Sequence, residues 1–143
     1  MTRMIGAKGL LVVTGLIIAV SAAAGCRGED ATAVSVSLGE WFVRPSQAAF
    51  KSGTVTMTVK NDGTIDHQFL VIKTERPPEA LVVDQQSYDV DERASGTPVG
   101  KLASFGPGHT ESVSLAMSKG SYVLLCNLPA HYRQGMRAPF TVE

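Results

Sequence analysis

Residues 126–136 read CNLPAHYRQGM and directly follow the apolar run YVLL of residues 122–125. A thiol (Cys126), an imidazole (His131) and a thioether (Met136) therefore share one short loop, with four residues in each gap. The run before Cys126 has the length and composition of a strand, so a sheet is expected to fix the position of the thiol. A last short strand over 138–142 would bring the loop back, so that all three side chains can meet at the strand ends.

A second imidazole lies far upstream at His67, at the start of the apolar run HQFLVI, which is typical of a strand in a sheet interior. Two imidazoles and one thiolate, with a long, weak thioether bond from the side, form a blue-copper ligand set. Because this mixed set accepts both Cu(I) and Cu(II), it can store one electron. The sequence therefore predicts one type 1 copper ion, with the ligands His67, Cys126, His131 and Met136.

Each of these residue types also has an ordinary structural role. A buried cysteine acts as a small hydrophobe, a methionine fills gaps, and a single histidine is commonly only hydrogen-bonded. The prediction rests on the shared spacing after a strand rather than on any one residue. The third histidine, His109, lies in the turn-like stretch GPGHT of residues 106–110 and is given no ligand role.

From Thr32 onward the sequence has the pattern of β-structure. Apolar and polar residues alternate over 34–38 and 54–60, which is the period of a strand. The segment Asn-Asp-Gly at 61–63 predicts a turn, and 110–116 resembles a further strand. Six to eight short strands separated by turns predict an all-β fold, a β-sandwich, with Trp41, Tyr122 and Phe140 in its core.

Residues 74–108 differ from the rest of the chain because they are rich in proline, glycine and acidic residues. We expect a long loop excursion there, with at most one helical turn near Pro78 to Leu81. Long loops in compact domains are usually functional or mobile. The excursion is expected to cover the site, to meet a partner, or to be an ordinary surface loop.

The first 25 residues have the form of a secretory signal. Arg3 and Lys8 precede the apolar run of residues 10–20, which is short for a membrane span, and small residues follow at 21–25. The predicted organisation is therefore a signal peptide over 1–25, a tether over 26–31 and one domain over 32–143. An uncleaved membrane anchor is the alternative for the first segment.

The run AAGC of residues 23–26 resembles a bacterial lipoprotein cleavage box, in which the cysteine becomes the first mature residue and is lipid-modified. This gives Cys26 a function and predicts an exported protein anchored at the outer face of the cytoplasmic membrane or in the periplasm. Cleavage after Ala24 is an alternative. A disulfide with Cys126 would also suit an exported protein, but it would consume the thiol that best explains the loop.

The overall charge excludes few functions. Without residues 1–25 the chain has two more acidic than basic side chains, and no basic run predicts nucleic-acid binding.

The motifs DHQF at 66–69 and YVLLCNLPAHYRQGM at 122–136 resemble those of the cupredoxins, the blue-copper family of plastocyanin and azurin. The resemblance covers about residues 32–143, and the loop spacing is most similar to that of rusticyanin, auracyanin and sulfocyanin. It implies a Greek-key β-sandwich with copper at one end. It also implies a monomeric electron carrier between redox proteins of a respiratory or related chain.

The resemblance further implies roles for residues around the ligands. Gln68 stands where many members have an asparagine that joins the two ligand segments by hydrogen bonds, and Asn127 is expected to supply part of that link. Asp66 stands where azurin has a glycine whose carbonyl approaches copper, so no fifth ligand is expected.

Electrons are expected to pass through His131, with Leu128, Pro129 and Ala130 in an apolar docking patch beside it. The neighbouring residues Arg133 and Arg137 either steer an acidic partner or are simply solvated charges.

Three other functions are weighed against electron transfer. A copper chaperone or storage protein is the alternative, but such proteins often use Met-rich or His-rich segments, and residues 26–143 contain only Met57, Met117 and Met136. An enzyme is not predicted, because further copper centres would need more histidines than the three in the chain. A metal-free adhesion domain would leave the Cys-His-Met loop unexplained.

Overall fold

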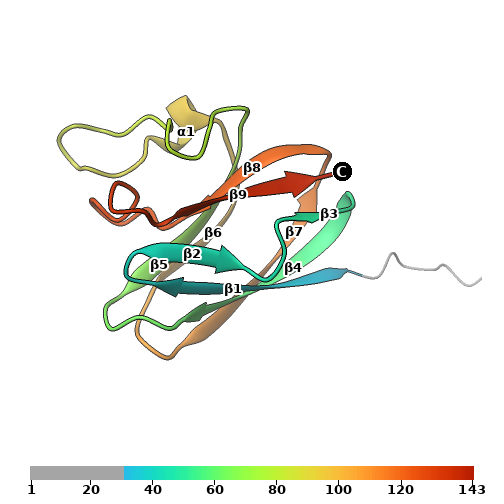
Figure 1. The fold of residues 1–143 in the computed structure, drawn as a ribbon, viewed down its shortest axis with the longest axis horizontal. Coiled ribbons are helices and arrows are strands. Elements are labelled where there is room, and N and C mark those ends of the chain that lie inside the picture. Colours follow the sequence, from blue (N-terminus) through green and yellow to red (C-terminus); the bar gives the residue numbers. More distant parts are fainter. Residues whose placement is uncertain (1–30) are drawn as a thin grey trace, which may run out of the picture.

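Two β-sheets pack face to face in the computed structural model, which describes residues 31–143 (Figure 1). One sheet has the strand order β2-β1-β4-β7, with β1 at Thr32–Gly39, β2 at Phe42–Pro45, β4 at Gly53–Asn61 and β7 at Thr110–Met117. The other has the order β3-β9-β8-β5-β6, with β3 at Ala49–Phe50, β5 at His67–Lys73, β6 at Thr97–Phe105, β8 at Gly120–Leu125 and β9 at Arg137–Val142. The predicted all-β sandwich is confirmed. The predicted signal over 1–25 and Cys26 lie outside the described residues.

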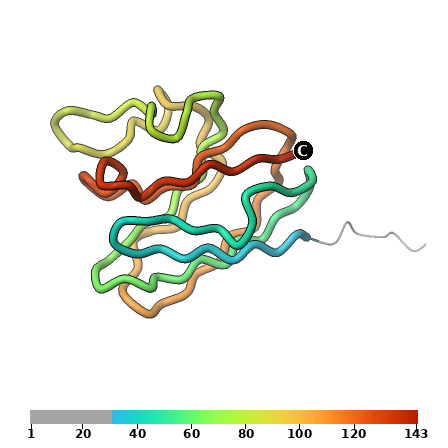
Figure 2. Tube along the Cα trace, viewed as in Figure 1, coloured from blue at the N-terminus to red at the C-terminus, as the bar shows by residue number. Residues whose placement is uncertain are grey.

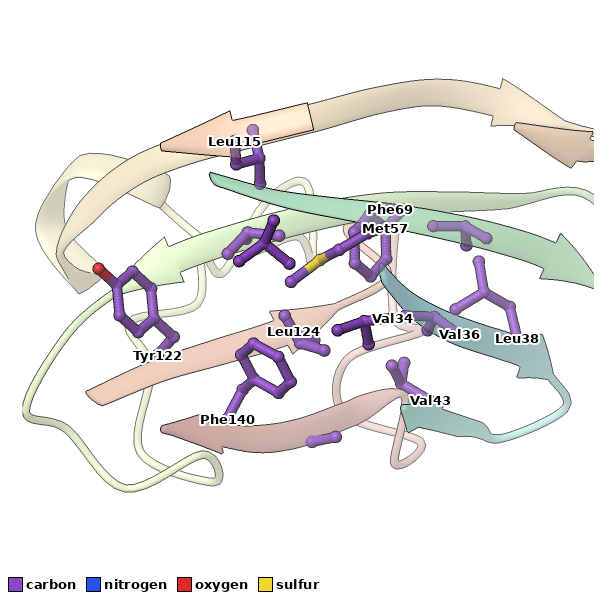
Figure 3. Packing of buried hydrophobic residues seen from close by; sticks show 14 of the residues in the cluster. Val34, Val36, Leu38, Val43, Met57, Phe69, Leu115, Tyr122, Leu124 and Phe140 are labelled. Carbon is purple, nitrogen blue, oxygen red and sulfur yellow. The ribbon is translucent and has the colours of Figure 1, made fainter. Parts of the chain in front are cut away.

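The core lies between the sheets and follows from the alternation of side chains along each strand. One sheet contributes every second residue of β1 and β4, and the other contributes alternate residues of β5, β8 and β9 (Figure 3). Tyr122 and Phe140 are buried in this core as predicted. Trp41 is not: its side chain is 38% exposed, because it lies in the turn after β1 rather than in a strand.

The order of the second sheet places two ligand-bearing segments side by side at one end of its central strands. β5 and β8 are antiparallel neighbours, with Leu70 opposite Leu125. Antiparallel strands place the start of one beside the end of the other. His67, the first residue of β5, therefore lies beside Cys126, which directly follows β8.

The loop excursion predicted over residues 74–108 is shorter in the structure, where regular elements occupy its second half. Residues 97–105 form the edge strand β6, which pairs only with β5, and α1 spans Glu92–Ser95. An edge strand tolerates Pro98 because one side of it needs no ladder hydrogen bonds, and the Pro and Gly content concealed the strand. The helical turn predicted near Pro78 is a single hydrogen-bonded turn, from the Ala80 N–H to the Pro77 carbonyl.

The irregular segment 74–91 packs beside the loop 127–136 at one end of the molecule, whereas the C-terminus and the start of β1 at Thr32 lie at the other end (Figure 2). A second apolar cluster joins this segment to the outer face of the sheet. Its buried members are Leu70, Ile72, Leu81, Val90, Val123, Leu125 and Tyr132. Within residues 31–143, no helix is long and apolar enough to cross a membrane.

Candidate metal centre

Three of the four predicted ligands meet at the end of the sandwich. The ligand atoms of His67, Cys126 and His131 all lie within 4.8 Å of one another. The Nδ1 atom of His131 is 3.3 Å from Nδ1 of His67 and 3.4 Å from Sγ of Cys126. Both imidazoles thus present the same nitrogen to one point beside the sulfur, which is the arrangement needed to share a metal ion.

His67 is fully buried, and an irregularity in the strand pairing lies beside it. The register of β5 against β6 shifts between His67 and Phe69. Such bulges re-aim a side chain and are common next to functional sites. The regular pairing of β5 with β6 is therefore interrupted at the residue whose imidazole faces the ligand loop.

The loop 127–136 is closed by its own backbone hydrogen bonds. The Cys126 N–H donates to the Met136 carbonyl over 3.1 Å, and the Met136 N–H donates to the His131 carbonyl over 3.1 Å. Gly135 has a φ of +118°, and a Cβ there would lie 3.0 Å from the Trp41 carbonyl oxygen. The positive φ and the close carbonyl explain why a glycine stands just before Met136.

Met136 is fully buried in the same apolar cluster as Cys126. Its thioether is a soft donor that would suit a weak bond to a soft metal ion. Together the four side chains match the nitrogen and sulfur donor set of type 1 copper, so the residues present fit that ion.

Burial sets the protonation of two of these groups. Burial raises the pKa of the Cys126 thiol, and the backbone N–H groups of Gln68 and Leu128 offset part of that rise. Burial lowers the pKa of His131, and the nearby His67 lowers it further. Neutral imidazole nitrogens are free to bind a metal, whereas the thiol must release its proton when a metal binds.

Gln68 joins the two ligand segments, but not through its side chain. Its backbone N–H donates to Sγ of Cys126 over 3.2 Å, which connects the start of β5 to the ligand loop. Its side-chain Oε1 is buried and accepts no hydrogen bond from the described residues. A backbone donor to the sulfur is independent of the side chain, so the change from asparagine to glutamine leaves this link in place.

Asn127 does not supply the predicted link to the His67 segment. Its Oδ1 accepts the Val90 N–H over 2.7 Å, and its Nδ2 donates to the Val90 carbonyl and to Oε1 of Glu92. These contacts hold the side chain against residues 90–92 rather than against the His67 segment. It fixes the first residue of the ligand loop to the excursion.

Sequence reasoning missed Asn61, which shapes the turn before His67. Its Nδ2 donates to the carbonyls of Ile65 (2.8 Å) and Phe105 (3.0 Å), and its Oδ1 accepts the Gly63 N–H over 2.9 Å. The segment was recognised as a turn from its Asn-Asp-Gly composition. The tendency of asparagine to bond nearby backbone was a usable signal for one of these three contacts.

Tyr132 is a second residue that sequence reasoning missed, and it holds the excursion against the ligand loop. Its side chain is 3% exposed. The hydroxyl donates to the Pro78 carbonyl over 2.7 Å and accepts the Leu81 N–H over 3.0 Å. Burial raises the pKa of Tyr132, so the hydroxyl keeps its proton for this donation at neutral pH.

Tyr132→Phe is expected to lower the free energy of unfolding by about 1–3 kcal/mol, because it leaves the buried Leu81 N–H and the partly buried Pro78 carbonyl without their partner. Urea denaturation of the metal-free protein measures this loss. Tyr88→Phe is the control, since Tyr88 is 49% exposed. Equal loss in both variants would contradict the role given to the Tyr132 hydroxyl.

Comparison with known proteins agrees with this geometry. The family described as copper binding proteins, plastocyanin/azurin family, matches residues 31–143. The chain is 26% identical to the dithionite-reduced auracyanin of the photosynthetic bacterium Roseiflexus castenholzii, covering 79% of this chain and 98% of that one, with a TM-score of 0.59. A comparison with curated proteins returned no match.

Two further solved structures share the fold at lower identity. Auracyanin A, a "blue" copper protein from Chloroflexus aurantiacus, is 18% identical over 78% of this chain and 98% of its own, with a TM-score of 0.55. Auracyanin B is 18% identical over 79% of this chain and 89% of its own, with a TM-score of 0.58.

Proposed function

Because this chain belongs to the plastocyanin/azurin family of copper-binding proteins, we propose that it carries single electrons between redox proteins outside the cytoplasm. The cupredoxin resemblance of its motifs is confirmed, and the protein is a blue copper electron-transfer protein. The observation that carries the proposal is the cluster of His67, Cys126 and His131, held by a sheet and a hydrogen-bonded loop. When bound, copper supplies the change between Cu(I) and Cu(II).

The proposed ligands are Nδ1 of His67 and His131, Sγ of Cys126 and, axially, the Met136 thioether. Cys126 and His67 are anchored by neighbouring strands, and the loop bearing His131 is closed at both ends by backbone bonds. These supports restrict movement of the ligands. Little rearrangement is therefore needed when the metal changes oxidation state, which favours rapid electron exchange.

The surface around His131 has the composition of a docking site. His131 is partly exposed, Pro129 is exposed, and Leu128 and Ala130 are partly exposed. The exposed large hydrophobic side chains among residues 31–143 are Trp41, Ile65 and Tyr88. All three belong to the ligand end of the molecule. Trp41 packs edge-on against the His131 ring, and Ile65 is two residues before His67. The Tyr88 carbonyl accepts the Ala130 N–H. A small apolar surface of this kind suits a brief redox encounter.

The visible spectrum of the purified domain loaded with Cu(II) tests the proposal. We expect an intense thiolate-to-copper band that a reductant bleaches and a small inorganic oxidant restores over repeated cycles. A colourless protein with one tightly held Cu(I) would favour copper handling instead. A protein that binds no copper would overturn the ligand assignment.

The proposed location outside the cytoplasm rests on the N-terminal sequence, and the position of β1 relative to the ligand loop is compatible with an anchor there. β1 begins at the end of the sandwich opposite the ligand loop (Figure 1). A lipid anchor on Cys26, joined through a short tether before Thr32, would therefore leave the ligand end free to meet a partner.

Cys26→Ala is expected to remove the lipid anchor and to move most of the protein from the membrane fraction to the soluble extract of the producing bacterium. Immunoblots of the two fractions measure this change, with Ser21→Ala as a control that leaves the cysteine in place. A Cys26→Ala protein that stays in the membrane fraction at the level of the unsubstituted chain would contradict lipid anchoring at this residue.

We further propose that the protein is monomeric and is not an enzyme. The chain has three histidines, two of which belong to the copper site. The third, His109, lies in the turn before β7, where its backbone carbonyl accepts the Asn61 N–H. Among the described residues, few ligands therefore remain for a second copper ion of the kind that copper enzymes use.

A further inference from the structure

The two-residue turn between β1 and β2 contacts both histidines of the copper site. Gly39 pairs with Phe42, so only Glu40 and Trp41 connect the strands. This turn belongs to the sheet that carries no ligand. Nevertheless, Oε1 of Glu40 lies 3.2 Å from Nε2 of His67, and the ring centroids of Trp41 and His131 are 5.1 Å apart.

Several donors hold the Glu40 carboxylate in place. The same oxygen, Oε1, accepts the Thr64 N–H over 2.9 Å and the Ile65 N–H over 3.2 Å, in addition to its contact with His67. The bond from Thr64 is the main reason that the pKa of Glu40 is lowered. Hydrogen bonds to an ionised carboxylate are stronger than those between neutral groups. The carboxylate is thus fixed, in its charged form, behind the His67 ring.

This contact determines which nitrogen of His67 is available to the metal. The ring is fully buried, so water does not compete for its nitrogens. When the Nε2–H group of His67 donates a hydrogen bond to Glu40, the free lone pair is on Nδ1, which faces His131. Histidines that bind metals commonly donate their other N–H to a carboxylate or carbonyl, which fixes the tautomer and raises the basicity of the ligand.

We propose that Glu40 is a positioning residue that holds His67 in its metal-binding tautomer and lowers the reduction potential of the bound copper; this inference rests on the proposed electron-transfer function. A negative charge behind a ligand stabilises Cu(II) more than Cu(I), because the interaction grows with the charge of the ion. The interposed His67 ring is fully buried, whereas the Glu40 side chain is 27% exposed, so solvent screens part of the effect and the expected shift is modest.

Glu40→Gln tests the role of the charge because it keeps an oxygen that can accept the Nε2 proton. We expect its preference for Cu(II) over Cu(I) to fall by about tenfold, which corresponds to a rise in potential of about 59 mV for a one-electron couple. Redox titration monitored at the blue band measures this shift. Asp66→Asn is the matched control, since Asp66 is exposed and adjacent to His67 in sequence. Its shift should be clearly smaller.

Glu40→Asp is a second variant that keeps the charge but shortens the reach to His67. Its potential should lie between those of the native protein and Glu40→Gln. If Glu40→Gln leaves the potential unchanged, or if Asp66→Asn shifts it equally, the specific role of Glu40 is overturned.

Nitrogen-15 NMR of the metal-free protein examines the hydrogen bond without copper. The His67 Nε2 proton should resonate downfield and exchange slowly in the native chain, and it should move upfield in Glu40→Gln. A native chain with a blue band but with this proton on Nδ1 would overturn the inference alone. A native chain without a blue band would overturn the proposed function, whereas the proton signal would still report the Glu40 contact.

Discussion

Cys126→Ser is expected to abolish the blue colour of the copper-loaded protein and to weaken copper binding by more than about 100-fold. The colour of a type 1 site comes from its thiolate, and a serine hydroxyl stays protonated at neutral pH and cannot replace that thiolate. Loss of an outer partner alone costs about 10- to 100-fold in metal affinity, so loss of this ligand should exceed that range. Visible absorption and competition with a Cu(I) chelator measure the two effects.

Met117→Leu is the matched control for Cys126→Ser. Met117 is also a buried sulfur residue, but it lies opposite Gly53 at the start of β4, whereas the site is at the other end of that strand. It should keep the full blue band. Near-native circular dichroism of metal-free Cys126→Ser would show that the fold is intact. Persistence of the band in Cys126→Ser would mean that another group donates to the metal.

Asn61→Ala is expected to lower the free energy of unfolding by about 2–4 kcal/mol and to disturb the copper site from a distance. Asn61 is fully buried, and its side chain is the partner of three backbone groups, those of Gly63, Ile65 and Phe105. Each buried polar group that loses its partner costs about 1–3 kcal/mol, less where water enters. Denaturant unfolding of the metal-free protein measures the loss.

Thr54→Ala is the control for this prediction, because Thr54 is exposed on the same strand and should change stability by less than about 0.5 kcal/mol. The turn shaped by Asn61 leads directly into His67. The blue band of copper-loaded Asn61→Ala should therefore shift or broaden, which a general loss of stability would not cause. Native stability in Asn61→Ala would contradict the structural role of this side chain.

The copper site shows which of its parts are encoded locally. Cys126, His131 and Met136 share one loop after a strand, so their spacing alone indicated that they could meet. Periodicity also placed His67 at the start of a buried strand. The contact between His67 and Cys126 depends on β5 and β8 being neighbours, which no local pattern in the sequence indicates. The supporting contacts of Asn127 were wrongly predicted, because no local pattern shows which way its side chain points.

The sequence by itself determined the strand periodicity and the sandwich class, and it indicated the candidate ligands of the loop, because these depend on hydrophobic patterning and on donor atoms a few residues apart. Only the tertiary structure decided that Glu40 lies behind His67 and that Trp41 packs edge-on against His131 instead of entering the core. It also revealed β6, whose residues are mostly exposed on an edge where neither alternation nor the absence of proline is required. These features depend on contacts between residues distant in the chain, which chain folding brings together and which leave no periodic trace in the sequence.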